Sequence, residues 1–216
     1  MGNIWKAARL DLALVRPYWK SVCFNLVLPV VFAAVNRSLL TGICFAMSTM
    51  AMATVYPFSI AEKNGMERLY GILPVPKGAL VLGRYVFVLA MGLLSLGVSL
   101  LAQPPVLRLL GVPVEPSEIV TAAAVGALLF VLFMVFQVPG YYRFGSIKGR
   151  AFLYIPVGGF LVISLALSKV PAVGRWVDSA AEAAPGRLIF SGALILLTLC
   201  ALSVLLSVRI MENKEL

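Results

Sequence analysis

Residues 62–73 are the part of the sequence whose residue types and spacing best fit a chemical role, and that role is recognition of a partner rather than catalysis. Four apolar side chains recur at i, i+3, i+4 and i+7, which places them on one face of a helix. They are Met66, Leu69, Tyr70 and Leu73. Asn64 and Glu67 have the spacing of a capping box, and Pro74 ends the helix. The stretch predicts an amphipathic helix of about three turns, which either lies on a membrane surface or docks into a soluble partner.

Residue types that carry catalysis or bind metals are scarce. The chain contains no histidine, so His-based triads, most zinc sites and imidazole proton relays are excluded. Cys23, Cys44 and Cys200 lie in apolar runs without metal-binding spacing, and we expect them to be packing residues. The phosphate-binding pattern G-x-x-x-x-G-K-[ST] is absent. We expect a chain that is not an enzyme and that binds no metal or cofactor of its own.

The elements that position residues 62–73 are membrane spans. Of the 216 residues, 61% are hydrophobic and 12% are charged, and the apolar residues gather in six runs of about spanning length. These runs cover 18–35, 39–60, 80–102, 119–138, 151–167 and 188–208. The predicted fold is an all-α polytopic membrane protein with six transmembrane helices, forming one domain over 1–216. The net charge of +9 resides mainly at the ends of the runs, which does not favour nucleic acid as a partner.

Three further segments are expected to lie at the membrane surfaces. Residues 1–17 predict an interfacial helix, with Trp5 and Trp19 at headgroup depth; a cleaved signal peptide is the alternative. Its polar face carries Lys6, Arg9, Asp11 and Arg16. Residues 141–150 predict a basic aromatic loop, after a break in the fourth span at Pro139 and Gly140. Residues 168–187 predict short re-entrant or interfacial helices on the outer side.

The distribution of basic residues predicts the orientation. With the N-terminus in the cytoplasm, thirteen of the eighteen Lys and Arg residues fall on the inside and five on the outside. The positive-inside rule then places both termini and residues 62–73 in the cytoplasm. The expected location is the cell membrane.

The interiors of the predicted spans carry polar side chains but no central charge. A proton- or sodium-driven transporter often has such a charge, so energy for transport is expected to enter from outside the membrane, through residues 62–73. The candidate substrate path consists of Asn25, Thr49, Thr54 and Gln137. A hydrated ion or sugar would find few hydrogen-bond partners there, whereas an amphipathic substrate would not need them.

The sequence YPFSIAEKNGMERLYGILPVPKGALVLGRY, residues 56–85, resembles the segment that follows the second span in ABC-2-type permeases. The pattern E-K-x-G-x-E-R-L…L-P-V carries the resemblance, which is strongest to the compact subgroup that includes phenol-soluble modulin and peptide exporters. The resemblance implies that residues 62–73 are a cytoplasmic coupling helix seated in a separate ATPase subunit. The implied contacts are Glu62, Lys63, Asn64, Gly65, Met66, Glu67, Arg68, Leu69, Tyr70 and Leu73.

The resemblance further implies an exporter of hydrophobic or amphipathic substrates, in particular peptides. It would contain two six-span subunits, identical or different, and two ATPase subunits that bind ATP and Mg. Two alternatives stay open. A six-span substrate-binding subunit of an energy-coupled importer would not need a capped amphipathic helix after its second span. A membrane-embedded enzyme is disfavoured by the missing histidines.

Overall fold

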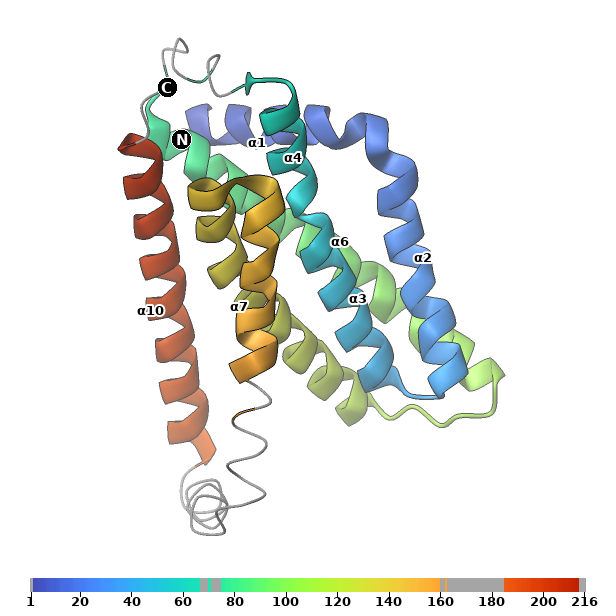
Figure 1. Ribbon diagram of the computed structural model, residues 1–216. Helices are drawn as coiled ribbons and strands as arrows, with labels where there is room; N and C mark the ends of the chain where they lie inside the picture. Colours follow the sequence, from blue (N-terminus) through green and yellow to red (C-terminus); the bar gives the residue numbers. More distant parts are fainter. Residues whose placement is uncertain (1, 67–69, 71–74, 160–161, 163–184, 214–216) are drawn as a thin grey trace.

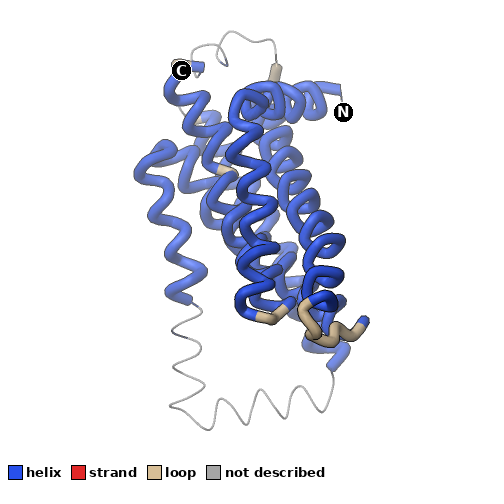
Figure 2. Tube along the Cα trace, turned by 90° about the vertical axis from the view of Figure 1, so that its right-hand side faces the viewer, coloured by secondary structure: helices blue, strands red, loops and turns tan. Residues whose placement is uncertain are grey.

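The computed structural model describes residues 2–66, 70, 75–159, 162 and 185–213, and every regular element in this part of the chain is helical. Figure 2 shows these helices as a bundle without strands in the described residues. The elements are α1 (Gly2–Val15), η1 (Arg16–Tyr18), α2 (Trp19–Asn36), α3 (Leu39–Ala53), α4 (Val55–Lys63), α6 (Lys77–Leu109), α7 (Pro116–Lys148), η2 (Gly149–Leu153) and α10 (Pro185–Glu212). The predicted all-α class is confirmed for this part of the chain.

The exterior of the bundle is that of a multi-pass membrane protein. Among the described residues, five helical stretches are long and apolar enough to cross a membrane: Gly2–Asn36, Leu39–Lys63, Lys77–Leu109, Pro116–Gly159 and Gly192–Glu212. Large apolar side chains are exposed along them, such as Phe24, Leu93, Leu101 and Leu205, and lipid rather than water suits such a surface. The predicted fourth span, 119–138, and the start of the predicted fifth span, 151–167, both lie in the stretch Pro116–Gly159. The remainder of the fifth lies outside the described residues, so the count of six stays a prediction.

Helix α1 lies across one end of the bundle, which we call the α1 end, and does not run along it (Figures 1 and 2). Pro17 stands in the 3-10 turn η1, which makes the corner into α2, and proline suits the first turn of a helix because its missing N–H needs no partner there. Trp5 and Trp19 are both more than half exposed. The α1 end also carries the last turn of α10, and Lys77 Nζ donates a hydrogen bond to the carbonyl oxygen of Glu212 at 3.3 Å.

Helices α2 and α3 form a tight hairpin, since only three residues separate the predicted runs 18–35 and 39–60. Arg37 adopts a left-handed conformation, with φ of 50°, and ends α2. Ser38 caps α3, since its Oγ accepts a hydrogen bond from the backbone N–H of Thr41 at 3.4 Å. α3 then packs against α2, α6 and α7, with Leu39 and Ile43 fully buried. The many small side chains of this span allow such close helix packing.

The second span is interrupted at Thr54, within the run 39–60 that the sequence predicts to be one helix. The Thr54 hydroxyl donates to the carbonyl oxygen of Ala51 at 2.7 Å, and Pro57 follows in the first turn of α4. Because a serine or threonine that bonds back onto its own helix bends it, the chain changes direction here. Glu62 and Lys63 form the end of α4, and Asn64 is its C-terminal cap residue. The predicted amphipathic helix over 62–73 therefore overlaps α4 at its start.

Helix α7 folds back on itself at Gly145, not at Pro139 and Gly140, so the predicted span break and the loop over 141–150 are wrong. Gly145 has φ of 77° and ψ of 177°, inside what is otherwise one helical run; L side chains rarely adopt this conformation. Pro139 stays inside the helix, as bundle neighbours can accommodate proline in a membrane helix. Tyr141 and Tyr142 are consequently buried rather than lying on a membrane surface.

The two arms of this fold approach each other closely. A Cβ added at Gly140 would lie 2.8 Å from Phe152 Cγ, and one added at Gly149 would lie 3.0 Å from the carbonyl oxygen of Gly140. The glycines thus let η2 and residues 154–159 pack back against α7, as Figure 1 shows. The predicted re-entrant helices over 168–187 lie outside the described residues except for 185–187, which begin α10.

Polar contacts hold α10 to the bundle. Tyr85 Oη on α6 hydrogen-bonds with Ser203 Oγ at 2.7 Å and with Ser207 Oγ at 3.0 Å. Ser203 Oγ also donates to the carbonyl oxygen of Val135 on α7 at 2.8 Å. All three side chains are buried. Hydrogen bonds of this type join helices where lipid supplies no alternative partner.

Candidate functional site

Five residues from five different segments meet inside the α1 end and form what we call the Arg84 cluster. They are Asp11 from α1, Phe58 from α4, Tyr70 from the predicted coupling helix, Arg84 from α6 and Tyr142 from α7. Each is at least nine-tenths buried. The cluster therefore links α1, α4, α6 and α7 with the predicted coupling helix.

An ion pair lies at the centre of the cluster. Arg84 Nη2 is 2.7 Å from Asp11 Oδ1, and Arg84 Nε is 3.1 Å from Asp11 Oδ2. The two parallel hydrogen bonds match the planar fork of a guanidinium to both oxygens of one carboxylate. The exposed fractions of the two side chains are 7% and 4%. Each charge thus depends on the other, because water does not solvate either of them.

Aromatic rings surround the guanidinium. Arg84 Cζ lies 4.6 Å from the centroid of the Phe58 ring and 6.0 Å from the centroids of both Tyr70 and Tyr142. Phe58 meets Tyr142 edge to face, with centroids 5.2 Å apart. Arg84 Nη2 also donates a hydrogen bond to Tyr70 Oη at 3.2 Å. Ring faces attract a cation at these distances, so the rings hold the arginine in place as well as shielding it.

A second polar contact joins the end of α4 to the fold in α7. Glu62 Oε2 accepts a hydrogen bond from the backbone N–H of Ser146 at 2.8 Å. A Cβ added at Gly145 would lie 3.0 Å from Glu62 Oε1, so the carboxylate rests against the turn itself. It satisfies an N–H that the left-handed Gly145 leaves without a helical partner. Glu62 and the members of the Arg84 cluster other than Asp11 border the same cavity of about 40 Å³.

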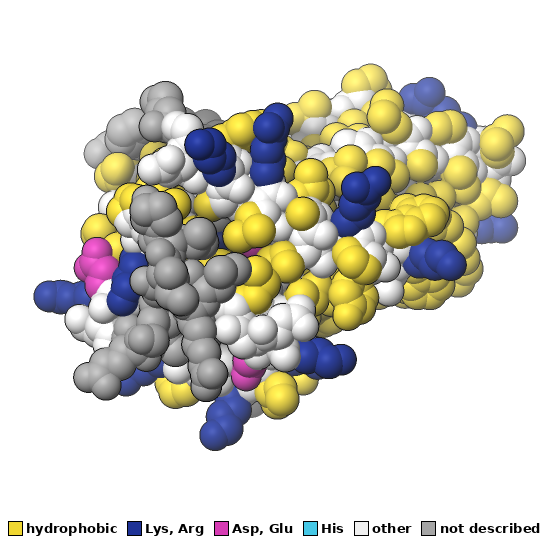
Figure 3. Space-filling model, turned by 90° about the horizontal axis from the view of Figure 1, so that it is seen from above, with side chains coloured by type: hydrophobic (Ala, Val, Ile, Leu, Met, Phe, Trp, Pro, Cys, Tyr) yellow, Lys and Arg dark blue, Asp and Glu magenta, His cyan; other side chains and the backbone are white. Residues whose placement is uncertain are grey.

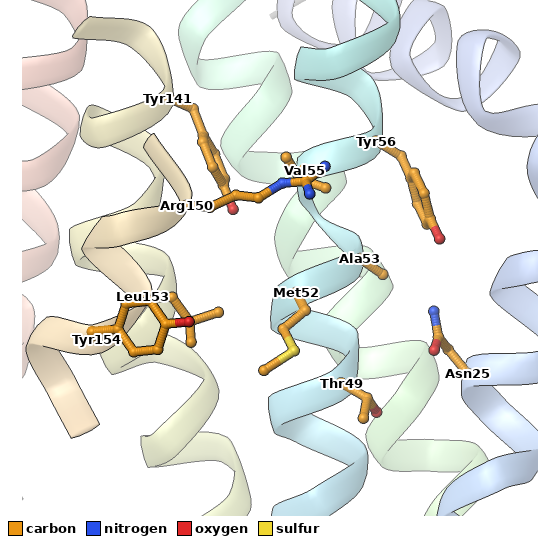
Figure 4. Close-up of a pocket in the computed structure, with 10 residues that line it drawn as sticks. All are labelled: Asn25, Thr49, Met52, Ala53, Val55, Tyr56, Tyr141, Arg150, Leu153 and Tyr154. Carbon is orange, nitrogen blue, oxygen red and sulfur yellow. The ribbon is translucent and has the colours of Figure 1, made fainter. Parts of the chain in front are cut away.

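A cleft of about 390 Å³ opens beside these contacts, between α2, the break after α3, and η2 (Figure 4). It is lined by Asn25, Thr49, Met52, Ala53, Val55, Tyr56, Tyr141, Arg150, Leu153 and Tyr154. In the close-up, the Arg150 side chain extends from η2 toward Val55 and passes Tyr141, while Asn25 and Tyr56 stand on the opposite wall. The cleft combines an apolar lining with one cation.

Residues 9–212 match the sequence model of the family described as ABC-2 family transporter protein. The chain belongs to the ABC-2 transporter family. No curated protein and no solved structure matches it. Membership makes this chain a membrane permease subunit of an ABC transporter, with ATP hydrolysis in a separate ABC ATPase subunit. The family assignment supports the permease prediction over the importer-subunit and enzyme alternatives.

Only part of the predicted coupling helix of this ABC-2 permease lies in the described residues. Glu62, Lys63, Asn64 and Gly65 are exposed, Met66 is half-buried and Tyr70 is buried. Glu67, Arg68, Leu69 and Leu73 lie outside the described residues. Tyr70 was expected on the docking face, yet its ring packs against Arg84 inside this chain. Helical periodicity identified the apolar face but not the surface that covers it.

Two of the four predicted substrate-path residues come together in the cleft, namely Asn25 and Thr49. Thr54 is buried, and its hydroxyl is used in the break after α3. Gln137 is fully buried and does not line the cleft, and its amide has no hydrogen-bond partner in the described part of the chain. The side-chain amide of Gln103 on α6 is likewise buried without a hydrogen-bond partner among the described residues.

The ion pair at the centre of the site was missed by sequence reasoning. Asp11 was assigned to the exposed polar face of the first helix, and Arg84 was counted only as a positive charge on the inner side. A signal was present, because Arg84 stands inside the apolar run 80–102 and a charge there needs a partner. Asp11 is the one acidic residue in 1–17.

Proposed function

We propose that this chain is the permease subunit of an ATP-driven exporter, in which residues 62–73 dock into the ATPase and the Arg84 cluster passes their movement to the bundle. One observation carries the proposal: Tyr70, a residue of the docking segment, is held by Arg84 of α6, which is itself bound to Asp11 of α1. A displacement of the segment must move or break these contacts. Buried charge pairs resist separation strongly, so the movement reaches α1 and α6.

Glu62 supplies a second connection in this proposal. Its hydrogen bond to Ser146 N links the start of the docking segment to the fold in α7. The segment thus contacts α6, and through it α1, at Tyr70, and it contacts α7 at Glu62. Packed helices of this kind move as rigid elements. ATP-driven displacement of residues 62–73 would shift α7 relative to α6 and open or close a path for the substrate.

The ATPase contacts in this proposal are the exposed residues Lys63, Asn64 and Gly65, together with Met66 and the remaining predicted contacts Glu62, Glu67, Arg68, Leu69, Tyr70 and Leu73. Tyr70 would serve as the inner anchor of the segment, because its ring is already covered by its own chain. The transporter would contain two ATPase subunits and two permease subunits, either identical or different, and ATP with Mg on the ATPases. Basic side chains greatly outnumber acidic ones in the view from the α1 end (Figure 3). This supports a cytoplasmic location for the α1 end and for both termini of a chain that spans the plasma membrane.

The proposed substrates are hydrophobic or amphipathic, and the resemblance of residues 56–85 favours peptides of the phenol-soluble modulin type. The apolar lining of the cleft and the polar residues Asn25 and Thr49 in it support an amphipathic substrate. Thr54 and Gln137 complete the proposed path. A polar sugar would lack partners for its hydroxyl groups in such surroundings.

A pull-down from native membranes tests the docking part of the proposal. The tagged wild-type chain should recover an ABC ATPase. Leu69→Asp or Met66→Asp would bury an unpaired charge in the interface, so recovery should fall at least tenfold, which corresponds to about 1.4 kcal/mol. Lys77→Ala, a change outside the segment, is the matched control. Equal recovery with all four chains would contradict docking through residues 62–73.

A further inference from the structure

The cleft between α2, the break after α3, and η2 contains the positive charge of Arg150, which no carboxylate of the described residues neutralises. Among the described residues no carboxylate lies within ion-pair distance of Arg150. The contrast with Arg84 is direct, since Arg84 has Asp11 as its partner at the same end of the bundle. Arg150 is exposed to the cleft, whereas Arg84 is buried. Since the described residues supply no counterion to Arg150, its guanidinium is available to an anion from outside the chain.

The position of Arg150 in the bundle indicates the depth in the membrane at which its counterion would lie. The residue lies inside the membrane-length stretch Pro116–Gly159 and five residues beyond the fold at Gly145. This separation is roughly 8–10 Å at 1.5–2.0 Å per helical residue. A basic side chain at this depth normally sits among lipid headgroups. The anion available at this depth belongs to a membrane amphipath.

The rest of the cleft fits the body of such a molecule. Met52, Ala53, Val55 and Leu153 give it an apolar lining beside the cation, and Figure 4 shows Met52 below the guanidinium. Tyr56 and Tyr141 bring hydroxyl groups to the same space. The volume of about 390 Å³ is at the lower end of the range of small-molecule sites, roughly 300–1,000 Å³. It suits one headgroup and the beginning of one chain, not a folded peptide.

We infer that this cleft binds an acidic phospholipid from the leaflet at the α1 end, with its phosphate on Arg150 and the start of its acyl chain against Met52 and Leu153. An arginine fork matches the geometry of a phosphate oxygen pair. The site would give the permease a preference for anionic amphipaths. That the bound molecule is also a transported substrate rests on the proposed exporter function, whereas the binding itself does not.

Binding of tail-spin-labelled lipids to the purified full chain in nanodiscs tests the inference. Wild type should prefer phosphatidylglycerol over phosphatidylcholine by on the order of tenfold, the effect expected of a charge-assisted hydrogen bond. Arg150→Gln should abolish the preference, and Arg150→Lys should retain part of it because Lys keeps the charge but not the fork. Arg143→Gln is the matched control, since Arg143 is exposed, lies over the Phe144 ring and does not line the cleft.

A second variant separates the cleft from the charge. Met52→Trp should fill the cleft and reduce phosphatidylglycerol binding although Arg150 is intact, and Met52 is half exposed, so the larger ring is tolerated. Equal affinity of the wild type for the two lipids would overturn the inference, as would equal losses in Arg150→Gln and Arg143→Gln. Displacement of phosphatidylglycerol by millimolar inorganic phosphate would also overturn it, because the ligand would then be the free anion.

Hydrolysis by the complex with its ATPase distinguishes failure of the inference from failure of the proposed function. Selective lipid binding without any stimulation of hydrolysis by any amphipath would support the site and contradict the exporter proposal. Stimulation by amphipathic peptides in a chain that shows no lipid preference would support the exporter and overturn the lipid site.

Discussion

Arg84 of α6 and Asp11 of α1 form a two-pronged ion pair between residues 73 positions apart in the sequence. Both side chains are buried, and Arg84 also donates to Tyr70 of the proposed docking segment. The first helix is therefore not a separate amphipathic helix that happens to lie at a membrane surface. Arg84 binds both α1, through Asp11, and the proposed docking segment, through Tyr70. Helix α1 and this segment should therefore move together.

Removing one partner of this pair should destabilise the bundle. Asp11→Ala leaves the Arg84 guanidinium buried without a counterion, and changes of this kind cost about 3–5 kcal/mol. The thermal unfolding midpoint of the detergent-purified chain should fall clearly. Lys6→Ala is the control, because Lys6 is exposed on the same helix. An Asp11→Ala variant as stable as Lys6→Ala would show that the pair does not hold α1 in place.

The fold in α7 should not tolerate a side chain at Gly145. Gly145→Ala forces alanine into a backbone conformation that is nearly exclusive to glycine, at a cost of about 1–3 kcal/mol, and its Cβ would lie 3.0 Å from Glu62 Oε1. We expect lower thermal stability and increased protease cleavage between α7 and η2. Gly97→Ala in α6 has open space around it and should be neutral. Similar stability of the two variants would argue against the turn.

The proposed orientation places the α2–α3 turn outside the cell and the end of α4 inside. In a background without the three native cysteines, Arg37→Cys should react with an impermeant thiol reagent in intact cells, and Asn64→Cys should react only after permeabilisation. Both positions are exposed, so accessibility within the protein does not decide the result. The reverse pattern would refute the orientation derived from the basic residues.

Local signals predicted local structure well. The hairpin at Arg37 and Ser38 followed from three polar residues between two apolar runs, and α1 followed from helical periodicity. The position of the fold in α7 was wrong because Pro139 and Gly140 were weighted as helix breakers, although a membrane bundle can accommodate both in a helix. Gly145 gave no stronger signal than its neighbours, since its left-handed backbone is imposed by the packing of the two arms.

The candidate site was harder to predict because its contacts are not local. Residues 62–73 were predicted to contact an ATPase, and the face of Tyr70 was assigned to that partner, whereas the Tyr70 hydroxyl accepts a hydrogen bond from Arg84 of its own chain. Periodicity defines which residues share a face, and only the tertiary structure defines what that face meets. Asn25 and Thr49 were predicted from polarity in an apolar run, whereas Arg150, on the same cleft, was assigned to a surface loop.

The response of ATP hydrolysis to substrate in Tyr70 variants tests the central claim most directly. In the reconstituted complex, Tyr70→Ala should still bind the ATPase through the rest of residues 62–73. Stimulation of hydrolysis by an amphipathic peptide should be lost, because Arg84 then has no contact with the Tyr70 side chain. Tyr70→Phe, which keeps the ring and removes only the 3.2 Å hydrogen bond, should retain part of the stimulation. Full stimulation in Tyr70→Ala, with the ATPase bound as in wild type, would contradict coupling through the Arg84 cluster.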